Sequence, residues 1–246
     1  MRYTRYPSSR SSFFGYFPPG VKWLLIVNVG MFLLMYLGGS RFAADFRVLA
    51  LAPAAVVGSF AIWQLVTYLF LHGSIGHLLF NMLSLWMFGS PLEGAWGTRR
   101  FLKYYFICGI GAGICDVAAN AAFGTWYTRT IGASGAIYGL LLAFGVIYPN
   151  QTVLMNFLFP IRAKYLVMIY GAIALLSAMG ENNGVSNIAH LGGMLFGYIY
   201  LKVRFPTVGF DLGRIRTSYN TWRLQRAKRK FQVYMKKQDD RDRWVN

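Results

Sequence analysis

The sequence predicts an all-α, polytopic membrane protein in which six transmembrane helices form a bundle. Of its 246 residues, 56% are hydrophobic and only 13% are charged, whereas soluble domains carry about 25% charged residues. The hydrophobic residues occur in long runs, and residues 132–148 and 188–201 contain no Lys, Arg, Asp or Glu. A bilayer core about 30 Å thick requires roughly 20 mostly apolar helical residues. We therefore expect lipid, rather than water, around most of the chain.

Six segments approach this length and composition. Proline and glycine separate them, as in the stretches GSPLEGAWG (89–97) and YPNQ (148–151). The first segment is long and does not end in a small-residue cleavage site, so we expect it to remain as a helix rather than to be removed as a signal peptide. The predicted spans cover residues 21–37, 73–90, 101–123, 132–148, 162–179 and 187–203.

A further apolar stretch, residues 48–71, is interrupted by Pro53, Gly58 and Gln64. We expect it to lie on the membrane surface or to form a re-entrant segment rather than to cross. If it does not cross, the side of the membrane opposite the two termini holds only three of the 25 Lys and Arg residues, namely Arg41, Arg47 and Arg129. Positively charged loops remain cytoplasmic, so both termini are predicted to be cytoplasmic.

These boundaries predict a cytoplasmic N-terminal segment (1–20), a six-helix membrane domain (21–203) and a basic cytoplasmic tail (204–246). The tail is expected to enforce the topology, and the alternative is an amphipathic helix that binds anionic lipid. No nucleic-acid partner is expected, because the tail has basic charge without a motif that reads bases. The N-terminal segment lacks the long amphipathic character of a transit peptide, which favours a prokaryotic plasma membrane.

The predicted topology gathers polar residues at one depth. The second, fourth and sixth spans would all begin at the outer face, and their first turns contain His72 and His77, Ser134, and His190, respectively. Asn81 follows one turn after His77. Polar groups inside a membrane are costly and generally indicate function. The cluster therefore predicts a site that opens to the outer side.

The chemistry of acyl transfer fits these residues. A serine hydroxyl needs a base to become a nucleophile, and His190 is the one histidine outside the region of the second span. Ser134 lies where the unpaired N–H groups of a helix start favour a developing anion. The side chains of His77 and Asn81, four residues apart, can donate to the same oxygen. No acidic residue is well placed, because Glu93 belongs to the predicted cytoplasmic loop after the second span, so we predict a Ser–His dyad.

Small residues around the predicted dyad favour close helix packing. Tyr138 lies four residues after Ser134 and could pack against the His190 ring. By itself, the Gly-x-Ser-Gly pattern is more typical of helix packing than of a nucleophile, and only the convergence of the polar groups argues otherwise. Two glycine pairs of the GxxxG type predict contact between the fourth and sixth spans: Gly135 with Gly139, and Gly193 with Gly197.

Four motifs resemble the rhomboid family of intramembrane serine proteases: HGSIGHLLFN (72–81), LEGAWGTRRF (92–101), GASGAIYG (132–139) and AHLGG (189–193). The resemblance covers about residues 60–201. It implies a six-helix core, with Ser134 as nucleophile and His190 as base. It also implies an oxyanion hole formed by the side chains of His77 and Asn81 with the Ser134 backbone N–H. The implied supporting residues are Gly132, Tyr138, His72, Gly193 and Gly197.

The sequence departs from the family at one position. The family often has Trp-Arg in its first outer loop, where this chain has Trp63 and Gln64. This departure concerns the anchoring of the loop rather than the chemistry. Asp116 and Asn120, one turn apart in the third span, could bond to each other or to a neighbouring helix, and their pattern indicates no function.

The resemblance implies an intramembrane serine endopeptidase that cleaves transmembrane segments of other membrane proteins. The alternative is a proteolytically silent relative that binds membrane clients, but such relatives lack the nucleophile or the base. A transporter would need polar residues towards the inner ends of the spans, whereas residues 144–148 and 194–201 are nearly all apolar. The sequence contains no metal-ligand cluster, and no cofactor is expected.

Overall fold

The computed structural model describes residues 17–39, 46–155, 158–179 and 187–204. Most of the predicted N-terminal segment and nearly all of the basic tail lie outside the described residues. The predicted topology of the termini and the predicted binding of anionic lipid by the tail are therefore not tested by the structure.

The described residues are mainly helical, and a helix occupies each of the six predicted ranges. These helices are α1 (Pro19–Leu37), α5 (Ile75–Trp96), α6 (Thr98–Ala122), α7 (Ser134–Ile147), α8 (Ala163–Met179) and α9 (Asn187–Arg204). Among the described residues, α1 and α6 are each long and apolar enough to cross a membrane, and α5 gives a third span if it is joined to the preceding residues 64–70, from which it is bent by 100°. Helices α7 and α8 are apolar but shorter. Six spans are compatible with this arrangement and stay a prediction.

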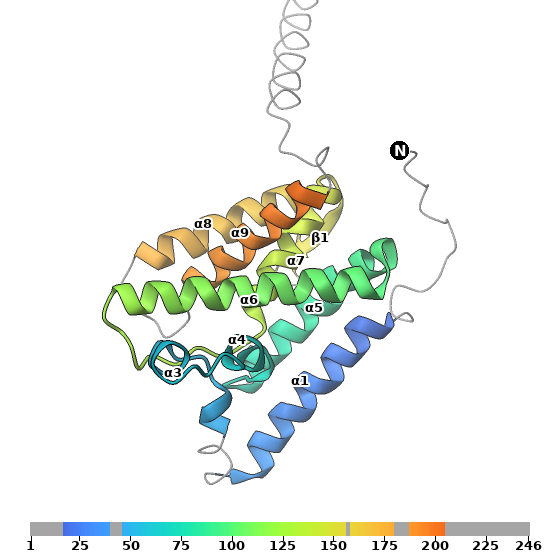
Figure 1. Ribbon diagram of the computed structural model, residues 1–246. Coiled ribbons are helices and arrows are strands. Elements are labelled where there is room, and N and C mark those ends of the chain that lie inside the picture. The colour runs from blue at the N-terminus through green and yellow to red at the C-terminus, as the bar shows by residue number, and fades with distance from the viewer. Residues whose placement is uncertain (1–16, 40–45, 156–157, 180–186, 205–246) are drawn as a thin grey trace, which may run out of the picture. The chain divides into compact units, whose positions relative to one another are not determined.

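Helix α7 contacts four other helices of the bundle drawn in Figure 1, namely α5, α6, α8 and α9. Ten of its 14 residues are buried, which its sequence allows because it contains no charged residue and many small ones. Helix α1 packs against α5. The N-terminus of α7, which carries Ser134, is therefore positioned by several neighbouring helices.

Helix α5 is longer than predicted. Residues 89–96 of the expected loop continue the helix through Pro91 to Trp96, and the helix ends at Gly97, which has a φ of +77°. Proline removes one helical hydrogen bond, but Leu92 in this part of the helix and Phe88 just before it are buried in the core. The prediction of a loop at 89–97 was wrong because the packing of this turn outweighs its local sequence pattern.

Glu93 therefore lies in α5 rather than in a loop. Its residue is 3% exposed, and its two carboxylate oxygens accept hydrogen bonds from the N–H groups of Gly20 at 2.8 Å and Val21 at 2.7 Å. The hydroxyl of Thr98 donates to the same carboxylate at 2.6 Å. The first N–H groups of a helix have no partner within the helix, so Glu93 caps α1 and joins it to α5.

The segment before α5 contains only short helical pieces among its described residues. They are η1 (Phe46–Leu49), α3 (Pro53–Gly58), α4 (Gln64–Thr67) and η2 (Tyr68–Phe70). None of these pieces is long enough to cross a membrane. The described residues of 48–71 thus contain no single transmembrane helix, and the location of this segment at the membrane surface or as a re-entrant loop stays a prediction.

Gln64 anchors this segment where the family often has arginine. Its residue is 3% exposed. Its Oε1 accepts a hydrogen bond from the N–H of Ala52 at 3.0 Å, and its Nε2 donates to the carbonyl oxygen of Val48 at 3.0 Å. The indole Nε1 of Trp63 donates to the same carbonyl at 3.1 Å. A neutral amide thus holds the loop by both its donor and its acceptor.

A β-hairpin between α7 and α8 was not predicted. Strand β1 (Thr152–Met155) pairs antiparallel with β2 (Phe159–Arg162), and Thr152 lies opposite Arg162. The eleven residues follow the YPNQ turn and carry a short apolar run, which by itself does not distinguish a strand from a loop between two spans. The hairpin is the exception to the all-α prediction within the described residues.

Candidate active site

Ser134 is the first residue of α7 and follows a loop that is pinned to the segment before α5. Gly132 has a φ of +119°, which favours glycine over residues with a Cβ atom, and its N–H donates to the carbonyl oxygen of Tyr68 at 2.9 Å. The backbones of Leu51 and Thr130 exchange two hydrogen bonds, at 3.0 and 2.8 Å. These contacts fix the path of the chain into α7 and leave Ser134 half-buried.

Ser134 forms a hydrogen bond with His190, which lies in the first turn of α9. The Nε2 atom of His190 is 2.8 Å from the Oγ atom of Ser134, although 56 residues separate them. His190 is 7% exposed, and its Nδ1 has no hydrogen-bond partner among the described residues. A serine and an imidazole at this distance have the geometry that nucleophilic catalysis requires. Their roles in a reaction stay a prediction.

Glycines bring α7 and α9 together. A Cβ atom at Gly193 would overlap the carbonyl oxygen of Gly135, whereas a Cβ atom at Gly139 would lie closest to the side chain of Cys108 on α6 and 3.1 Å from the carbonyl oxygen of Gly193. Substitution of Gly193 would therefore separate α9 from α7, and the hydrogen bond between Ser134 and His190 depends on their proximity.

Gly197 of α9 faces a different helix from Gly193. We expected it to face the fourth span, but the atoms nearest to it belong to Tyr104 and Cys108 of α6. Four residues advance a helix by slightly more than one turn, about 40° beyond it. Because α9 packs against both α6 and α7, this rotation is enough to move Gly197 from one neighbour to the other.

Tyr138 stacks on the imidazole of His190. Their ring centroids are 4.1 Å apart and the rings are parallel within 3°. The ring of Tyr138 also meets the ring of Tyr170 from α8 edge to face, with centroids 6.1 Å apart and an interplanar angle of 82°. The stack restricts the orientation of the imidazole, which keeps Nε2 directed towards Ser134.

The side chains of His77 and Asn81 from α5 converge beside Gly132. A Cβ atom at Gly132 would lie 2.7 Å from Nε2 of His77 and 3.8 Å from Nδ2 of Asn81. Asn81 is 7% exposed, and its Nδ2 has no hydrogen-bond partner among the described residues. Together with the N–H of Ser134 at the helix start, these groups could donate to a negatively charged oxygen next to the serine.

His72 lies just before α5 rather than in its first turn. It is 2% exposed, and its ring meets the ring of His77 edge to face with centroids 4.9 Å apart. Burial and, to a smaller extent, the nearby His77 lower the pKa of His72 to about 4. His72 is therefore neutral at neutral pH and packs against His77 rather than against Ser134.

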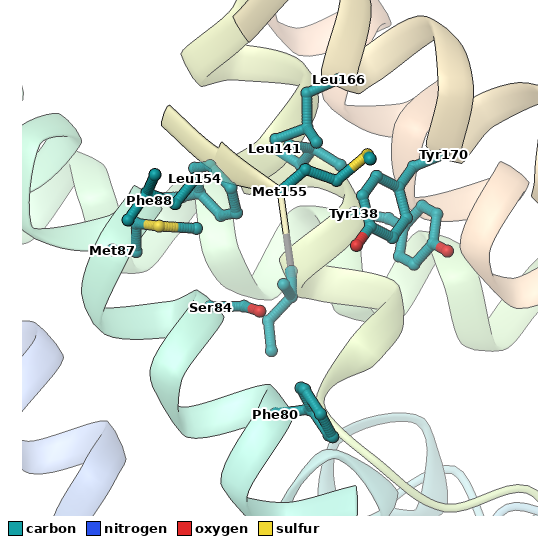
Figure 2. A pocket seen from close by; sticks show the side chains of 11 residues that line it. Phe80, Ser84, Met87, Phe88, Tyr138, Leu141, Leu154, Met155, Leu166 and Tyr170 are labelled. Atoms are coloured by element: carbon teal, nitrogen blue, oxygen red, sulfur yellow. The ribbon is translucent and has the colours of Figure 1, made fainter. Parts of the chain in front are cut away.

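A largely apolar pocket lies between α5, α7, α8 and β1 and shares Tyr138 with the candidate site (Figure 2). Tyr138 contributes to both features, because one face stacks on His190 while the ring also lines the pocket. The polar exceptions in the lining are Ser84 and the hydroxyls of Tyr138 and Tyr170. The remaining side chains are those of Phe80, Met87, Phe88, Ile137, Leu141, Leu154, Met155 and Leu166.

No feature of the sequence indicated this pocket. Leu154 and Met155 reach it from a strand that was not predicted, and Tyr170 lies on a helix where an aromatic residue is equally typical of a surface that faces lipid. A pocket built from four separate elements has no local sequence pattern that could reveal it.

Comparison with known proteins gives consistent matches. A model of the Rhomboid domain matches residues 59–207, a range that contains every residue of the candidate site. RHOMBOID-like protein 2 of Arabidopsis thaliana is 35% identical over 176 residues, which cover 70% of this chain and 50% of that protein. RHOMBOID-like protein 1 of the same plant is 36% identical, over 61% of this chain and 36% of its own length.

A bacterial relative is similar to the same extent. Rhomboid protease GluP of Bacillus subtilis (strain 168) is 32% identical over 170 residues, which cover 68% of this chain and 31% of that protein. The chain thus spans half or less of the length of these three relatives. One of the three is named a protease, and the two plant proteins are named only as rhomboid-like.

Proposed function

This chain belongs to the rhomboid family, and we propose that it is a serine endopeptidase that cleaves membrane-spanning segments of other membrane proteins. The observation that carries the proposal is the 2.8 Å separation of Ser134 Oγ from His190 Nε2. The family includes a relative named as a protease, which supports the same activity.

The first half of the reaction forms an acyl-enzyme. With a proton on Nδ1, the Nε2 atom of His190 accepts the proton of the Ser134 hydroxyl, and Oγ attacks the carbonyl carbon of the scissile peptide bond. The resulting imidazolium then gives this proton to the nitrogen of the leaving amine as the C–N bond breaks. The acyl group remains on Ser134 as an ester.

The second half releases the acid. His190 removes a proton from water, the hydroxide attacks the ester carbon, and the proton returns to Ser134 Oγ as the C–O bond breaks. In both halves the carbonyl oxygen becomes an oxyanion, which the side chains of His77 and Asn81 and the backbone N–H of Ser134 stabilise. Gly132 leaves space for this oxygen, and Tyr138 keeps the base oriented.

The substrate is expected to be an extended, locally unwound part of a membrane-spanning segment. A peptide bond inside a helix is shielded by its own backbone, so glycine or proline near the cut and small residues at the cut should favour cleavage. The pocket beside Tyr138 provides apolar side chains from α5, α7 and α8, which suit the apolar residues of such a segment.

We further propose that the site opens to the outer side of a prokaryotic plasma membrane and that both termini are cytoplasmic. The distribution of Lys and Arg supports this orientation. The basic tail beyond residue 203 then faces the cytoplasmic leaflet, where anionic lipid would attract it.

The test is the loss of activity on removal of either dyad member. Ser134→Ala and His190→Ala should each abolish cleavage of a model single-span substrate, and Ser134→Ala should also abolish labelling by a fluorophosphonate probe. Ser177→Ala, at an exposed position of α8, is the matched control and should cleave at the normal rate. A near-normal rate in either dyad variant would refute the assignment, and binding of the substrate without cleavage by the natural protein would favour the proteolytically silent alternative.

The oxyanion donors should matter less than the dyad. Asn81→Ala or His77→Ala should lower kcat by on the order of 10²–10³ at most, which is the usual cost of one donor. The measurement is the steady-state rate on the same substrate in detergent. An unchanged kcat in Asn81→Ala would exclude this side chain from the oxyanion hole.

A further inference from the structure

A buried tyrosine of α6 contacts both helices that carry the dyad. Tyr104 is 0% exposed, and its hydroxyl donates a hydrogen bond to the carbonyl oxygen of Gly139 in α7 at 2.8 Å. The same hydroxyl lies beside Gly197 of α9, where an added Cβ atom would come within 2.5 Å of it. One oxygen atom from α6 therefore reaches α7 and α9 at the same level.

The aromatic ring of Tyr104 is packed on two further sides. It meets the ring of Tyr200 from α9 edge to face, with centroids 5.4 Å apart. It meets the ring of Trp96, at the end of α5, in the same way with centroids 5.2 Å apart. Aromatic pairs of this geometry are favourable beyond the area that they bury, so the ring keeps the hydroxyl directed at α7.

The hydroxyl of Tyr104 lies one helical turn beyond the point at which α7 and α9 touch. The backbones of Gly135 and Gly193 are in contact there. Each of the two glycines beside the hydroxyl follows one of these residues by four positions, or about one turn. Ser134 directly precedes Gly135, so a displacement of α7 at the level of the hydroxyl moves the serine with it.

We propose that Tyr104 is a positioning residue of the active site, whose hydroxyl holds α7 against α6 and α9 and thereby sets the separation of Ser134 from His190. This inference rests on the proposed serine endopeptidase function. Tyr104 does not touch the reacting atoms, and the pocket is lined by residues of α5, α7, α8 and β1. Loss of the hydroxyl should therefore lower kcat, which depends on the dyad, and leave KM nearly unchanged.

The adjacent tyrosine provides a matched control within the full chain. Tyr105 is also 0% exposed, but its hydroxyl has no hydrogen-bond partner among the described residues. Tyr104→Phe should lower both kcat on the model substrate and the rate of fluorophosphonate labelling about tenfold, in line with a small misplacement of reacting groups. Tyr105→Phe should leave both rates unchanged. A normal kcat in Tyr104→Phe, a loss confined to KM, or an equal loss in Tyr105→Phe would overturn the proposal.

A compensating pair tests whether the hydroxyl acts between the two helices. Gly197→Ala places a methyl group against the hydroxyl of Tyr104 and should lower kcat more than Tyr104→Phe does. In the double variant Gly197→Ala/Tyr104→Phe the methyl group takes the space of the missing hydroxyl, so kcat should rise to about the level of Tyr104→Phe. All variants are compared below their midpoints of thermal unfolding in detergent. Additive losses in the double variant would overturn the proposal.

The accessibility of a buried thiol gives a readout without catalysis. Cys108 is 0% exposed and lies where α6 faces α7 and α9, so the helices that Tyr104 holds together cover its thiol. With Cys115→Ala to remove the other cysteine, N-ethylmaleimide should modify Cys108 faster in Tyr104→Phe than in the protein that keeps this tyrosine. Tyr105→Phe should not change the rate of modification.

This readout separates the inference from the proposed function. If the natural protein neither cleaves substrate nor reacts with the fluorophosphonate probe, the proposed function fails, and faster modification of Cys108 would still show that Tyr104 holds the helices together. Equal rates of modification with and without the Tyr104 hydroxyl would overturn its role whether or not the protein is active.

Discussion

The two sides of α7 pack in opposite ways. Towards α9, backbone approaches backbone so closely that a Cβ atom at Gly193 would overlap the carbonyl oxygen of Gly135. Towards α5 and α8, large side chains such as Phe88 and Leu166 line a pocket instead. The tight side carries the hydrogen bond between Ser134 and His190. The chain is therefore tightly packed where Ser134 meets His190, and it leaves space on the side where, under the proposed function, a substrate segment would bind.

The largest effect is expected on the tight side. Gly193→Ala should reduce cleavage to the level of Ser134→Ala, because the added methyl group must separate α7 from α9, and a displacement of about 1 Å can already cost 10²-fold in rate. The measurements are the cleavage rate and the midpoint of thermal unfolding. Gly30→Ala in α1, where a Cβ atom would meet nothing within 4 Å, is the control and should retain both. Full activity in Gly193→Ala would show that the two helices can separate without cost.

An intermediate effect is expected at Tyr138, which belongs to both sides. Tyr138→Phe preserves the ring that stacks on His190 and should remain close to normal, whereas Tyr138→Leu removes the stack and should slow probe labelling about tenfold, since misorientation of the base lowers the rate. The comparison is made by the rate of fluorophosphonate labelling, which does not require a substrate helix. Equal rates in the two variants would mean that the stacked ring does not orient the base.

The smallest effect is expected in the pocket. Ser84→Leu adds bulk at a position that lines it and should raise KM by roughly tenfold or less, with a much smaller change in the labelling rate. Ser177→Leu at an exposed position of α8 makes the same exchange outside the pocket. If Ser84→Leu changed labelling as strongly as KM, the pocket and the dyad would be one rigid unit, and the contrast between the two sides of α7 would be wrong.

Much of the fold was predictable because membrane helices have a local signature. Apolar runs separated by proline and glycine located all six helices, and Pro53, Gly58 and Gln64 distinguished the irregular segment from a span. The errors occurred where tertiary contacts outweighed local pattern. Helix α5 continues to Trp96 because its last turns are buried and because Glu93 caps α1.

In the candidate site, too, some features follow from local sequence and others from tertiary contacts. The sequence by itself determined that the chain is helical and apolar, and it supplied one serine, three histidines and an asparagine near helix starts, because composition and spacing are local properties. Only the tertiary structure decided that Ser134 lies 2.8 Å from His190 and that Gly197 faces α6 rather than α7. Such contacts join residues that are distant in the chain, and their distances depend on the packing of every helix between them rather than on any single stretch of sequence.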